Sequence, residues 1–156
     1  SDVYKRQVGD QVPDFSLLDQ DGNQTSPADF AGKRFLVWFY PKASTPGCTA
    51  EGCNLRDHHT EFENRGIEIV GISMDSVKRQ KNFATKQNFP YKLLADESGE
   101  VTKAFGAYGP KKFMGREFMG TVRSTFLINN NKILKEWRNI KAIGHAKEVL
   151  NFIENY

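Results

Sequence analysis

Residues 35–53 read FLVWFYPKASTPGCTAEGC, and this stretch indicates a strand, a tight turn and the start of a helix. The first six residues form an apolar and aromatic run, which is typical of a strand buried on both faces. Proline and glycine then mark a turn, and residues 53–64 have helical character. The stretch also holds both cysteines of the chain, Cys48 and Cys53. A cysteine at a strand-to-helix junction lies near helix N-terminal amides, which stabilise a thiolate.

Strands and helices alternate around this stretch. Strands are expected at residues 15–18, 24–25, 35–40, 67–73, 92–95, 124–128 and 133–137, and helices at 48–64, 76–87, 98–105 and 144–155. Residues 109–116 are interpreted as an irregular basic loop, which either borders the functional site or belongs to the ordinary surface. The alternation predicts an α/β fold with a mixed central sheet flanked by helices.

The composition narrows the classes of protein to which the chain can belong. Its 156 residues suit one domain, and the net charge of +3 comes from 22 basic and 19 acidic residues that are interspersed. Short basic clusters are interpreted as solvated faces, so no nucleic-acid partner is expected. No apolar run approaches the roughly 18 residues that span a bilayer, and no signal-peptide pattern is found, so no membrane partner is expected. Two cysteines are too few for a disulfide-stapled secreted scaffold, which indicates a reducing compartment, most simply the cytoplasm.

Cys48 is the candidate nucleophile. A thiol with a pKa of about 8.5 is only a few per cent thiolate at neutral pH, so a nucleophilic cysteine needs help from its surroundings. Pro46 and Gly47 shape the turn, and the helix N-terminus adds positive partial charge. Thr45 carries a hydroxyl that can orient a substrate oxygen or the sulfur. Glu51 is expected to cap the helix N-terminus as an acidic side chain.

Cys53 lies five residues after Cys48, and this spacing decides whether the two can pair. On an unbroken helix their Cα atoms would be roughly 8 to 9 Å apart, whereas a disulfide needs about 7 Å or less. Pairing therefore requires at least the first helical turn to unwind. Gly52 weakens the helix there by about 1 kcal/mol relative to alanine. The spacing suits a device with two states, a folded thiolate and a locally unfolded disulfide.

Three other interpretations of the cysteines compete with this one. A lone buried cysteine is usually a small hydrophobic residue. A zinc site could draw on His58 and His59, but adjacent histidines point to different faces of a helix. Dithiol exchange of the thioredoxin type usually uses a C-x-x-C motif, which the sequence lacks.

The pattern Pro-x-x-x-Thr-x-x-Cys, formed by Pro41, Thr45 and Cys48, resembles the active-site signature of peroxiredoxins. The longer run 40–53, with its second cysteine five residues on, is similar to the Q-type subfamily, also called bacterioferritin comigratory protein. Residues 8–15, 120–128 and 144–150 resemble the opening, the arginine-bearing segment and the C-terminal helix of that subfamily. The resemblance therefore predicts one domain over residues 8–156, with residues 1–7 a disordered or artefactual lead-in.

The resemblance implies a thioredoxin-like fold with an N-terminal hairpin extension, and a role for each matching residue. Cys48 would be the peroxidatic cysteine and Cys53 the resolving one. Thr45 would hydrogen-bond the peroxide, Pro41 would shield the thiolate from water, and Arg123 would stabilise the thiolate and the developing charge. Without the resemblance, Arg123 would be interpreted as a surface charge at a strand edge.

The implied activity is thiol-dependent reduction of hydrogen peroxide and organic hydroperoxides, with no metal or bound cofactor. Cys48 sulfenic acid would condense with Cys53, and thioredoxin or a similar dithiol protein would reduce the disulfide. The resemblance suggests a monomer or weak homodimer. Two competing hypotheses are a redox-sensing interaction module that uses the same thiol switch, and a non-catalytic domain stabilised by zinc.

Overall fold

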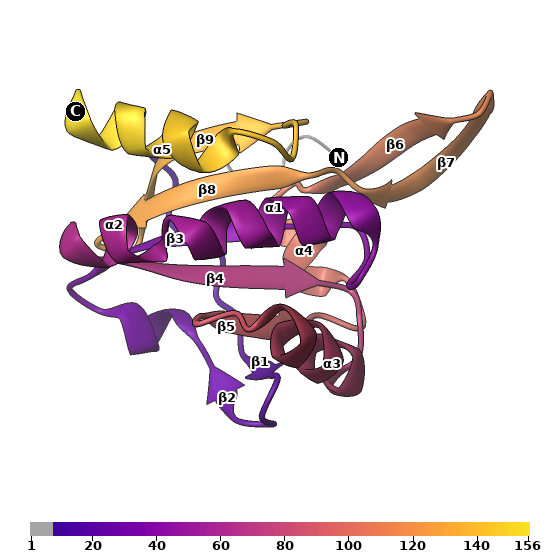
Figure 1. The fold of residues 1–156 in the computed structure, drawn as a ribbon, viewed down its shortest axis with the longest axis horizontal. Coiled ribbons are helices and arrows are strands. Elements are labelled where there is room, and N and C mark those ends of the chain that lie inside the picture. Colours follow the sequence, from indigo (N-terminus) through magenta and orange to yellow (C-terminus); the bar gives the residue numbers. More distant parts are fainter. Residues whose placement is uncertain (1–7) are drawn as a thin grey trace.

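A seven-stranded mixed sheet organises the computed structural model, which describes residues 8–156 (Figure 1). Its strands are β1 (Leu17–Asp19), β2 (Gln24–Thr25), β3 (Arg34–Phe39), β4 (Ile67–Ser73), β5 (Lys92–Ala95), β8 (Ser124–Asn129) and β9 (Lys132–Arg138), in the order β2-β1-β5-β4-β3-β8-β9. Strands β3, β4 and β5 pair in parallel, whereas β8 pairs antiparallel with both β3 and β9. The predicted mixed sheet is therefore present. The expected lead-in, residues 1–7, lies outside the described residues.

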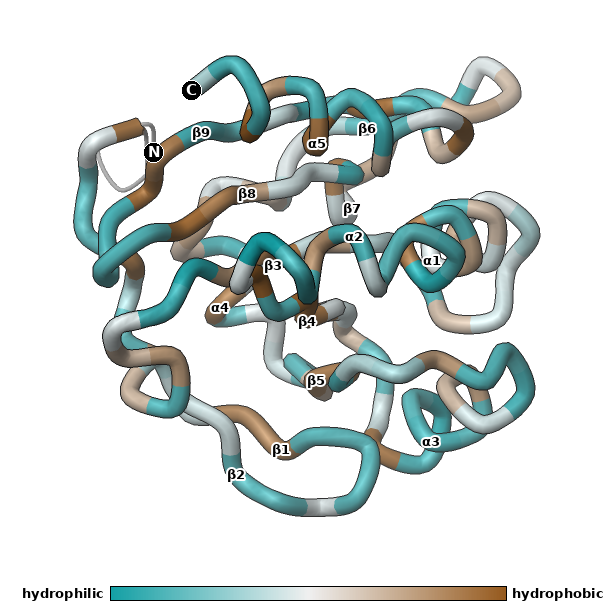
Figure 2. The backbone as a smooth tube through the Cα atoms, turned by 60° about the vertical axis from the view of Figure 1, so that its left-hand side comes forward, coloured by the Kyte–Doolittle hydropathy of each residue, from teal (hydrophilic) through white to brown (hydrophobic). Residues whose placement is uncertain are grey.

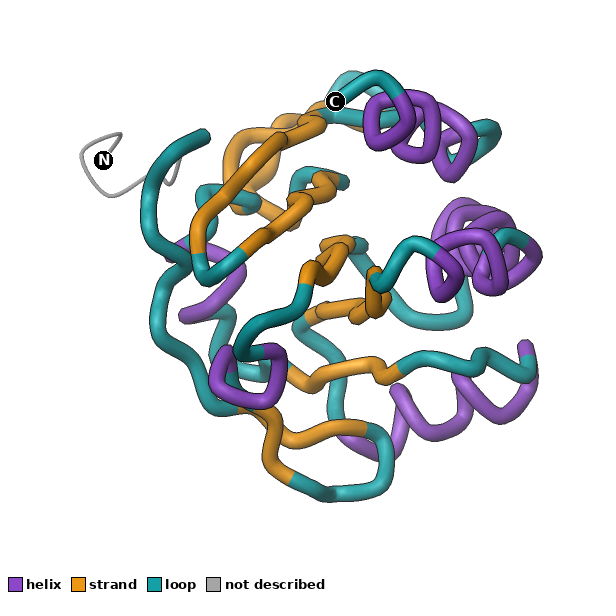
Figure 3. Tube along the Cα trace, turned by 90° about the vertical axis from the view of Figure 1, so that its left-hand side faces the viewer, coloured by secondary structure: helices purple, strands orange, loops and turns teal. Residues whose placement is uncertain are grey.

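The buried strand β3 separates two hydrophobic layers. Leu36, Trp38 and Tyr40 pack on one face with apolar residues of α1 (Pro46–Asp57), α2 (His59–Asn64), α3 (Val77–Gln87) and α5 (His145–Glu154). Phe35, Val37 and Phe39 face the other layer, which includes η2 (Pro27–Phe30) and α4 (Glu100–Ala104). Figure 3 shows helices on both sides of the sheet, and Figure 2 shows the hydrophobic residues concentrated along its inner strands. The continuous apolar run thus buries both faces of β3, as its pattern predicts.

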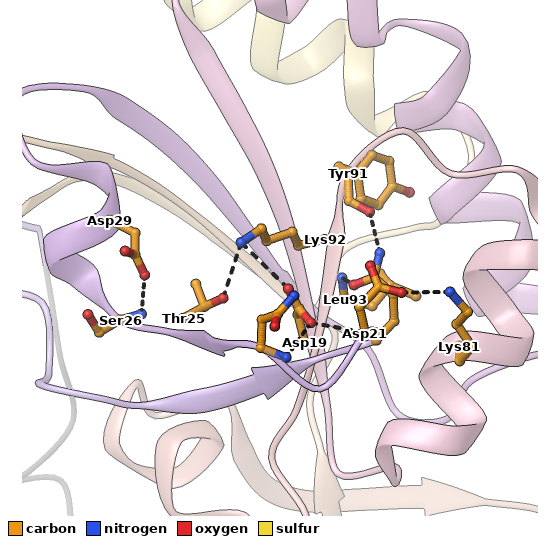
Figure 4. A network of polar contacts seen from close by, with 11 residues as sticks. Asp19, Asp21, Thr25, Ser26, Asp29, Lys81, Tyr91, Lys92 and Leu93 are labelled. Atoms are coloured by element: carbon orange, nitrogen blue, oxygen red, sulfur yellow. Dashed lines mark hydrogen bonds and ion pairs between the residues drawn. The ribbon is translucent and has the colours of Figure 1, made fainter.

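Polar contacts attach the N-terminal hairpin β1–β2 to the rest of the sheet (Figure 4). The Lys92 ammonium lies 3.5 Å from a carboxylate oxygen of Asp19 and 3.5 Å from the Thr25 hydroxyl. Lys81 of α3 pairs with Asp21 in the turn at 2.6 Å. Strand β1 also pairs antiparallel with β5. These links join the expected hairpin extension to the parallel part of the sheet.

The predicted helix at residues 48–64 is wrong in extent, because it consists of two helices. α1 begins at Pro46 and ends at Asp57. Proline is tolerated at the first helical position, because the backbone nitrogen there makes no hydrogen bond within the helix. At His58 the ring Nδ1 lies 2.9 Å from the Asn54 carbonyl oxygen, the acceptor that the next α-helical turn would use. The His58 amide instead donates to the Leu55 oxygen at 3.2 Å, which tightens the chain between α1 and α2.

The predicted irregular loop at 109–116 is also wrong. Residues Tyr108–Phe113 form β6 and Arg116–Thr121 form β7, a separate antiparallel hairpin. The turn consists of Met114 and Gly115, whose φ angles are 52° and 79°. Two consecutive positive φ angles match the right-handed twist of the strands. Pro110 obscured this hairpin in the sequence, and it is tolerated because two-stranded sheets have only edge strands.

Gly52 allows α1 to approach the aromatic side chains beneath it. A Cβ atom at this position would lie 2.4 Å from the Phe89 ring and 3.1 Å from the Trp38 ring. Both rings belong to the core, so neither is free to move into solvent. Glycine at position 52 therefore lowers the helix propensity of α1 but allows the helix to pack closely on the core.

We expect Gly52→Ala to destabilise the reduced protein by about 1–2 kcal/mol, because overpacking outweighs the roughly 1 kcal/mol gained in helix propensity. Urea unfolding checks this. The control is Ala50→Gly at an exposed position of α1, which reports propensity alone. A Gly52→Ala protein as stable as the parent would contradict the packing argument.

Candidate active site

Cys48 lies in the first turn of α1, directly beyond the end of the central strand β3. The chain leaves β3 at Phe39, turns through residues 40–45 and enters the helix with Thr45 at the cap position. The turn is fixed by Asp75, whose carboxylate accepts hydrogen bonds from the Ala43 amide and the Ser73 hydroxyl, both at 2.7 Å. Cys48 is almost fully buried, with 1% of its surface exposed. The sulfur therefore sits where the N-terminal amides of α1 favour negative charge.

Arg123 brings a full positive charge to this sulfur from far along the chain. It lies in the two-residue link between β7 and β8. Its Nη2 donates to Cys48 Sγ at 3.4 Å, and its Nη1 donates to Glu51 Oε1 at 2.6 Å. A Cβ atom on Gly47 would lie 3.1 Å from Nη2, so glycine leaves room for the guanidinium above the first turn. The structure thus brings two of the predicted site residues, Cys48 and Arg123, into contact.

Glu51 corrects an expectation, because it does not cap the N-terminus of the helix. Its side chain is fully buried and forms an ion pair with Arg123. Oε2 has no hydrogen-bond partner within residues 8–156. Burial raises the pKa of Glu51 from its ordinary value of 4.5 to about 7, against the opposing effect of Arg123. The signal in the sequence was its position three residues after Cys48, which places both on one helix face.

The guanidinium keeps its charge despite partial burial. Burial lowers the pKa of Arg123, but the adjacent Cys48 and Glu51 together outweigh burial and leave that pKa raised. Lys111 of β6 is a second cation near the site. Burial and then Arg123 lower the pKa of Lys111, whereas Cys48 opposes this change. Sequence reasoning did not assign Lys111 to the site, because it lay in the supposed loop.

Thr45 and Pro41 lie on the same connection between β3 and α1. The Thr45 hydroxyl donates to the Lys42 carbonyl oxygen at 2.7 Å. Its proton is therefore engaged, and the lone pairs of its oxygen are left to accept a hydrogen bond. Both residues are half-buried and flank the turn that leads to Cys48.

Cys53 lies on the same continuous helix as Cys48, and both are free thiols. Cys53 Sγ contacts Gln87 Oε1 at 3.4 Å. The surrounding helical segment is held by its neighbours: the Tyr91 hydroxyl donates to the Gly52 carbonyl at 2.8 Å, and the Ala146 amide of α5 donates to Asn54 Oδ1 at 2.9 Å. The helix around Cys53 is therefore held by contacts from outside α1.

Residues 8–156 contain no group of three or more His, Cys, Asp and Glu side chains that could hold a metal ion. Among the helices of this same part of the chain, none has the length and apolar character required to cross a membrane.

Comparisons with known proteins identify the family of the chain. A family model described as the AhpC/TSA family matches residues 8–137. Peroxiredoxin Bcp of Escherichia coli is 43% identical over 150 residues, which is 96% of each chain. A solved structure of Xanthomonas campestris bacterioferritin comigratory protein, described for its alkyl peroxide reduction activity, is 37% identical with a TM-score of 0.85 over 90% of each chain. A PrxQ mutant from Xylella fastidiosa is 32% identical, with a TM-score of 0.90 over 96% of each chain.

These likenesses confirm the predicted family and the thioredoxin-like fold. The family model covers most of the chain, and the similarity to the Escherichia coli protein extends over nearly its whole length. This chain therefore belongs to the AhpC/TSA family as a peroxiredoxin with Bcp and PrxQ homologues, and it is a peroxidase of the oxidoreductase class.

Proposed function

We propose that this peroxidase reduces hydrogen peroxide and organic hydroperoxides through a Cys48 sulfenic acid and a Cys48–Cys53 intramolecular disulfide. One observation carries the proposal: the Arg123 guanidinium contacts both the Cys48 sulfur and the buried Glu51 carboxylate. This arrangement supports a thiolate at Cys48 and supplies a fixed cation where peroxide cleavage develops charge. The Xanthomonas relative, whose description concerns alkyl peroxide reduction, supports organic substrates.

In the first step the Cys48 thiolate attacks the terminal oxygen of the hydroperoxide. A sulfur–oxygen bond forms, the oxygen–oxygen bond breaks, and its electron pair leaves with the second oxygen. That oxygen takes a proton and departs as water or an alcohol, while the sulfur becomes sulfenic acid. Arg123 stabilises the developing charge, and the lone pairs of Thr45 accept a hydrogen bond from the peroxide O–H. Pro41, in the turn before Cys48, shields the thiolate from water.

In the second step the sulfur of Cys53 attacks the sulfur of Cys48 sulfenic acid. A disulfide forms, the sulfur–oxygen bond breaks, and the oxygen leaves as water. Five residues of continuous helix keep the Cα atoms roughly 8 to 9 Å apart, so the start of α1 must unwind first. Unwinding breaks the Arg123–Glu51 ion pair and the Tyr91–Gly52 hydrogen bond. These contacts therefore set how readily the disulfide forms.

In the third step a dithiol protein such as thioredoxin reduces the disulfide by exchange, and the protein returns to its starting state. Two free thiols on a segment that must refold in each cycle suit a reducing compartment, most simply the cytoplasm. The proposed working unit is a monomer or a weak homodimer, because both cysteines of the cycle lie on one helix of one chain.

Stopped-flow consumption of peroxide by the reduced protein tests the two cysteines. We expect Cys48→Ser to lose rapid consumption, because no other thiol is held against Arg123. Cys53→Ser is expected to complete one turnover but to lose recycling by thioredoxin, because the sulfenic acid has no resolving thiol. Undiminished consumption by Cys48→Ser would refute the mechanism. Slow consumption by the wild type, together with a partner that binds only the disulfide form, would favour the redox-sensing module.

Tyr91→Phe tests the contacts that keep α1 folded. Loss of a hydrogen bond worth about 1 kcal/mol is expected to accelerate disulfide formation about fivefold, with little change in the first step. Rapid acid quench followed by mass spectrometry separates sulfenic acid from disulfide. Tyr108→Phe is the matched control, because Tyr108 lies in β6 rather than against α1. Disulfide formation at an unchanged rate would show that the Tyr91 contact does not limit unwinding.

Glu51 should leave a pH signature on stability, measured in a Cys48→Ser background to remove the thiol. The folded carboxyl keeps its proton up to a pKa of about 7, whereas an unfolded one loses it near 4.5. The folded state therefore binds more protons in this window, and stability falls as pH rises through it. Relative to Glu51→Gln, the Glu51 protein should lose unfolding free energy between about pH 5 and about pH 8. Urea unfolding measures the difference.

Glu61→Gln, at an exposed position, is the control for removing a carboxylate from the protein. A difference between the Glu51 protein and Glu51→Gln that stays constant with pH would contradict the raised pKa of Glu51.

A further inference from the structure

The β6–β7 hairpin exposes large apolar side chains beside the active site. Phe113, Met114, Phe118 and Met119 are 67%, 85%, 47% and 58% exposed. Figure 1 shows the hairpin leaving the body next to the beginning of α1, and Arg123 follows β7 after a single residue. Contiguous exposed apolar groups are uncommon unless they bind something.

The register of the hairpin divides its side chains between two faces. One face carries the pairs Gly109–Gly120, Lys111–Phe118 and Phe113–Arg116. The opposite face carries the pairs Tyr108–Thr121, Pro110–Met119 and Lys112–Glu117. The side chains of Lys111 and Lys112 therefore point to opposite sides of the hairpin. The same holds for Phe118 and Met119.

Contacts show which face is turned toward Cys48. Tyr108, on the opposite face, lies under the Lys103 ammonium of α4 at 5.0 Å, and Thr121 donates to the Met74 sulfur at 3.8 Å. These contacts attach that face to the body of the protein away from α1. Helix α1 packs on the layer of the sheet opposite to α4, so the first face of the hairpin is turned to the side of α1, and the influence of Arg123 and Cys48 on the pKa of Lys111 agrees with this placement. The face with Lys111 and Phe118 therefore borders the sulfur.

Lys111 and Phe118 form one surface next to two glycines, which carry no side chains. A Cβ atom on Gly120 would lie 3.4 Å from Lys111 Cδ and 3.5 Å from the Phe118 ring. The aliphatic stem of Lys111 and the aromatic ring thus lie beside each other at this glycine. Gly109, its cross-strand partner, also has no side chain. An aromatic ring beside the Lys111 ammonium, next to two glycines that add no side chain, suits an organic group with an apolar body and an anionic end.

We propose that Lys111 and Phe118 form the surface that recognises the organic substituent of the hydroperoxide, with Phe118 contacting its apolar body and Lys111 favouring a negatively charged group on it. The proposal rests on the peroxidase mechanism above and assigns to it two specificity-determining residues. Hydrogen peroxide carries no substituent, so it makes neither contact. The two residues therefore act on the choice between substrates rather than on the oxygen–oxygen cleavage itself.

The ratio of kcat/KM for cumene hydroperoxide to kcat/KM for hydrogen peroxide tests Phe118. For Phe118→Ala we expect this ratio to fall about tenfold, because an apolar contact of the substrate is lost. Met119→Ala, the neighbour on the opposite face, is expected to leave the ratio within about twofold. An unchanged ratio in Phe118→Ala, or an equal fall in both variants, would overturn the role of Phe118.

The charge of Lys111 is tested with two substrates that share one body, cumene hydroperoxide and 4-carboxycumene hydroperoxide. Lys111→Met keeps the aliphatic stem and should lower the ratio of the charged to the neutral substrate about five- to tenfold, an effect that salt also reduces. Lys112→Met is the matched control on the opposite face. An unchanged ratio in Lys111→Met would overturn the role of its charge.

These outcomes separate the specificity proposal from the mechanism. If the variants keep rapid hydrogen peroxide consumption and the substrate ratios do not move, the specificity surface is refuted while the peroxidase mechanism stands. If the wild type fails to oxidise Cys48 with any of the three hydroperoxides, the mechanism and the specificity surface fall together.

Discussion

A partly buried guanidinium that is paired on two sides constrains this active site. Arg123 reaches the Cys48 sulfur with one nitrogen and the Glu51 carboxylate with the other. Removing either partner would leave the guanidinium charge less compensated in a poorly solvated place, which is costly. The pair also ties the first turns of α1 to the link between β7 and β8. One interaction therefore supplies the electrostatics of the nucleophile and holds its helix in place.

The same helix must be stable enough to form the site and weak enough to open. Close packing of Gly52 against Phe89 and Trp38, together with the Tyr91 hydrogen bond, favours the folded form. Glu51 counters this, because burial disfavours its ionised state and leaves Oε2 without a partner among the described residues. Close packing stabilises this helical segment and the buried Glu51 carboxyl destabilises it, so the segment can unwind locally while the sheet beneath it stays intact. In the proposed cycle this balance lets Cys53 reach Cys48.

Much of the fold followed from the sequence, because its signals were local. The apolar run of β3, the proline and glycine of the turn, and the alternation of strands and helices all depend on nearest neighbours. Where a side chain competed for a backbone hydrogen bond, or where the position of a strand at a sheet edge decided the outcome, pattern reasoning failed. The His58 ring interrupts a helix that periodicity would continue, and the β6–β7 hairpin forms despite Pro110 because both of its strands are edges. Glu51 was expected to cap the helix, because no residue nearby in the sequence indicates that Arg123 pairs with it.

The sequence by itself determined the candidate nucleophile, the spacing of the two cysteines and the family, since these depend on residue types at short, fixed intervals. The tertiary structure decided what surrounds them. It placed a cation from 75 residues downstream on the Cys48 sulfur, buried Glu51 against that cation, and put Lys111 and Lys112 on opposite faces of the β6–β7 hairpin. The physical reason is that charge pairing and burial depend on distances in space, which strand order and register set.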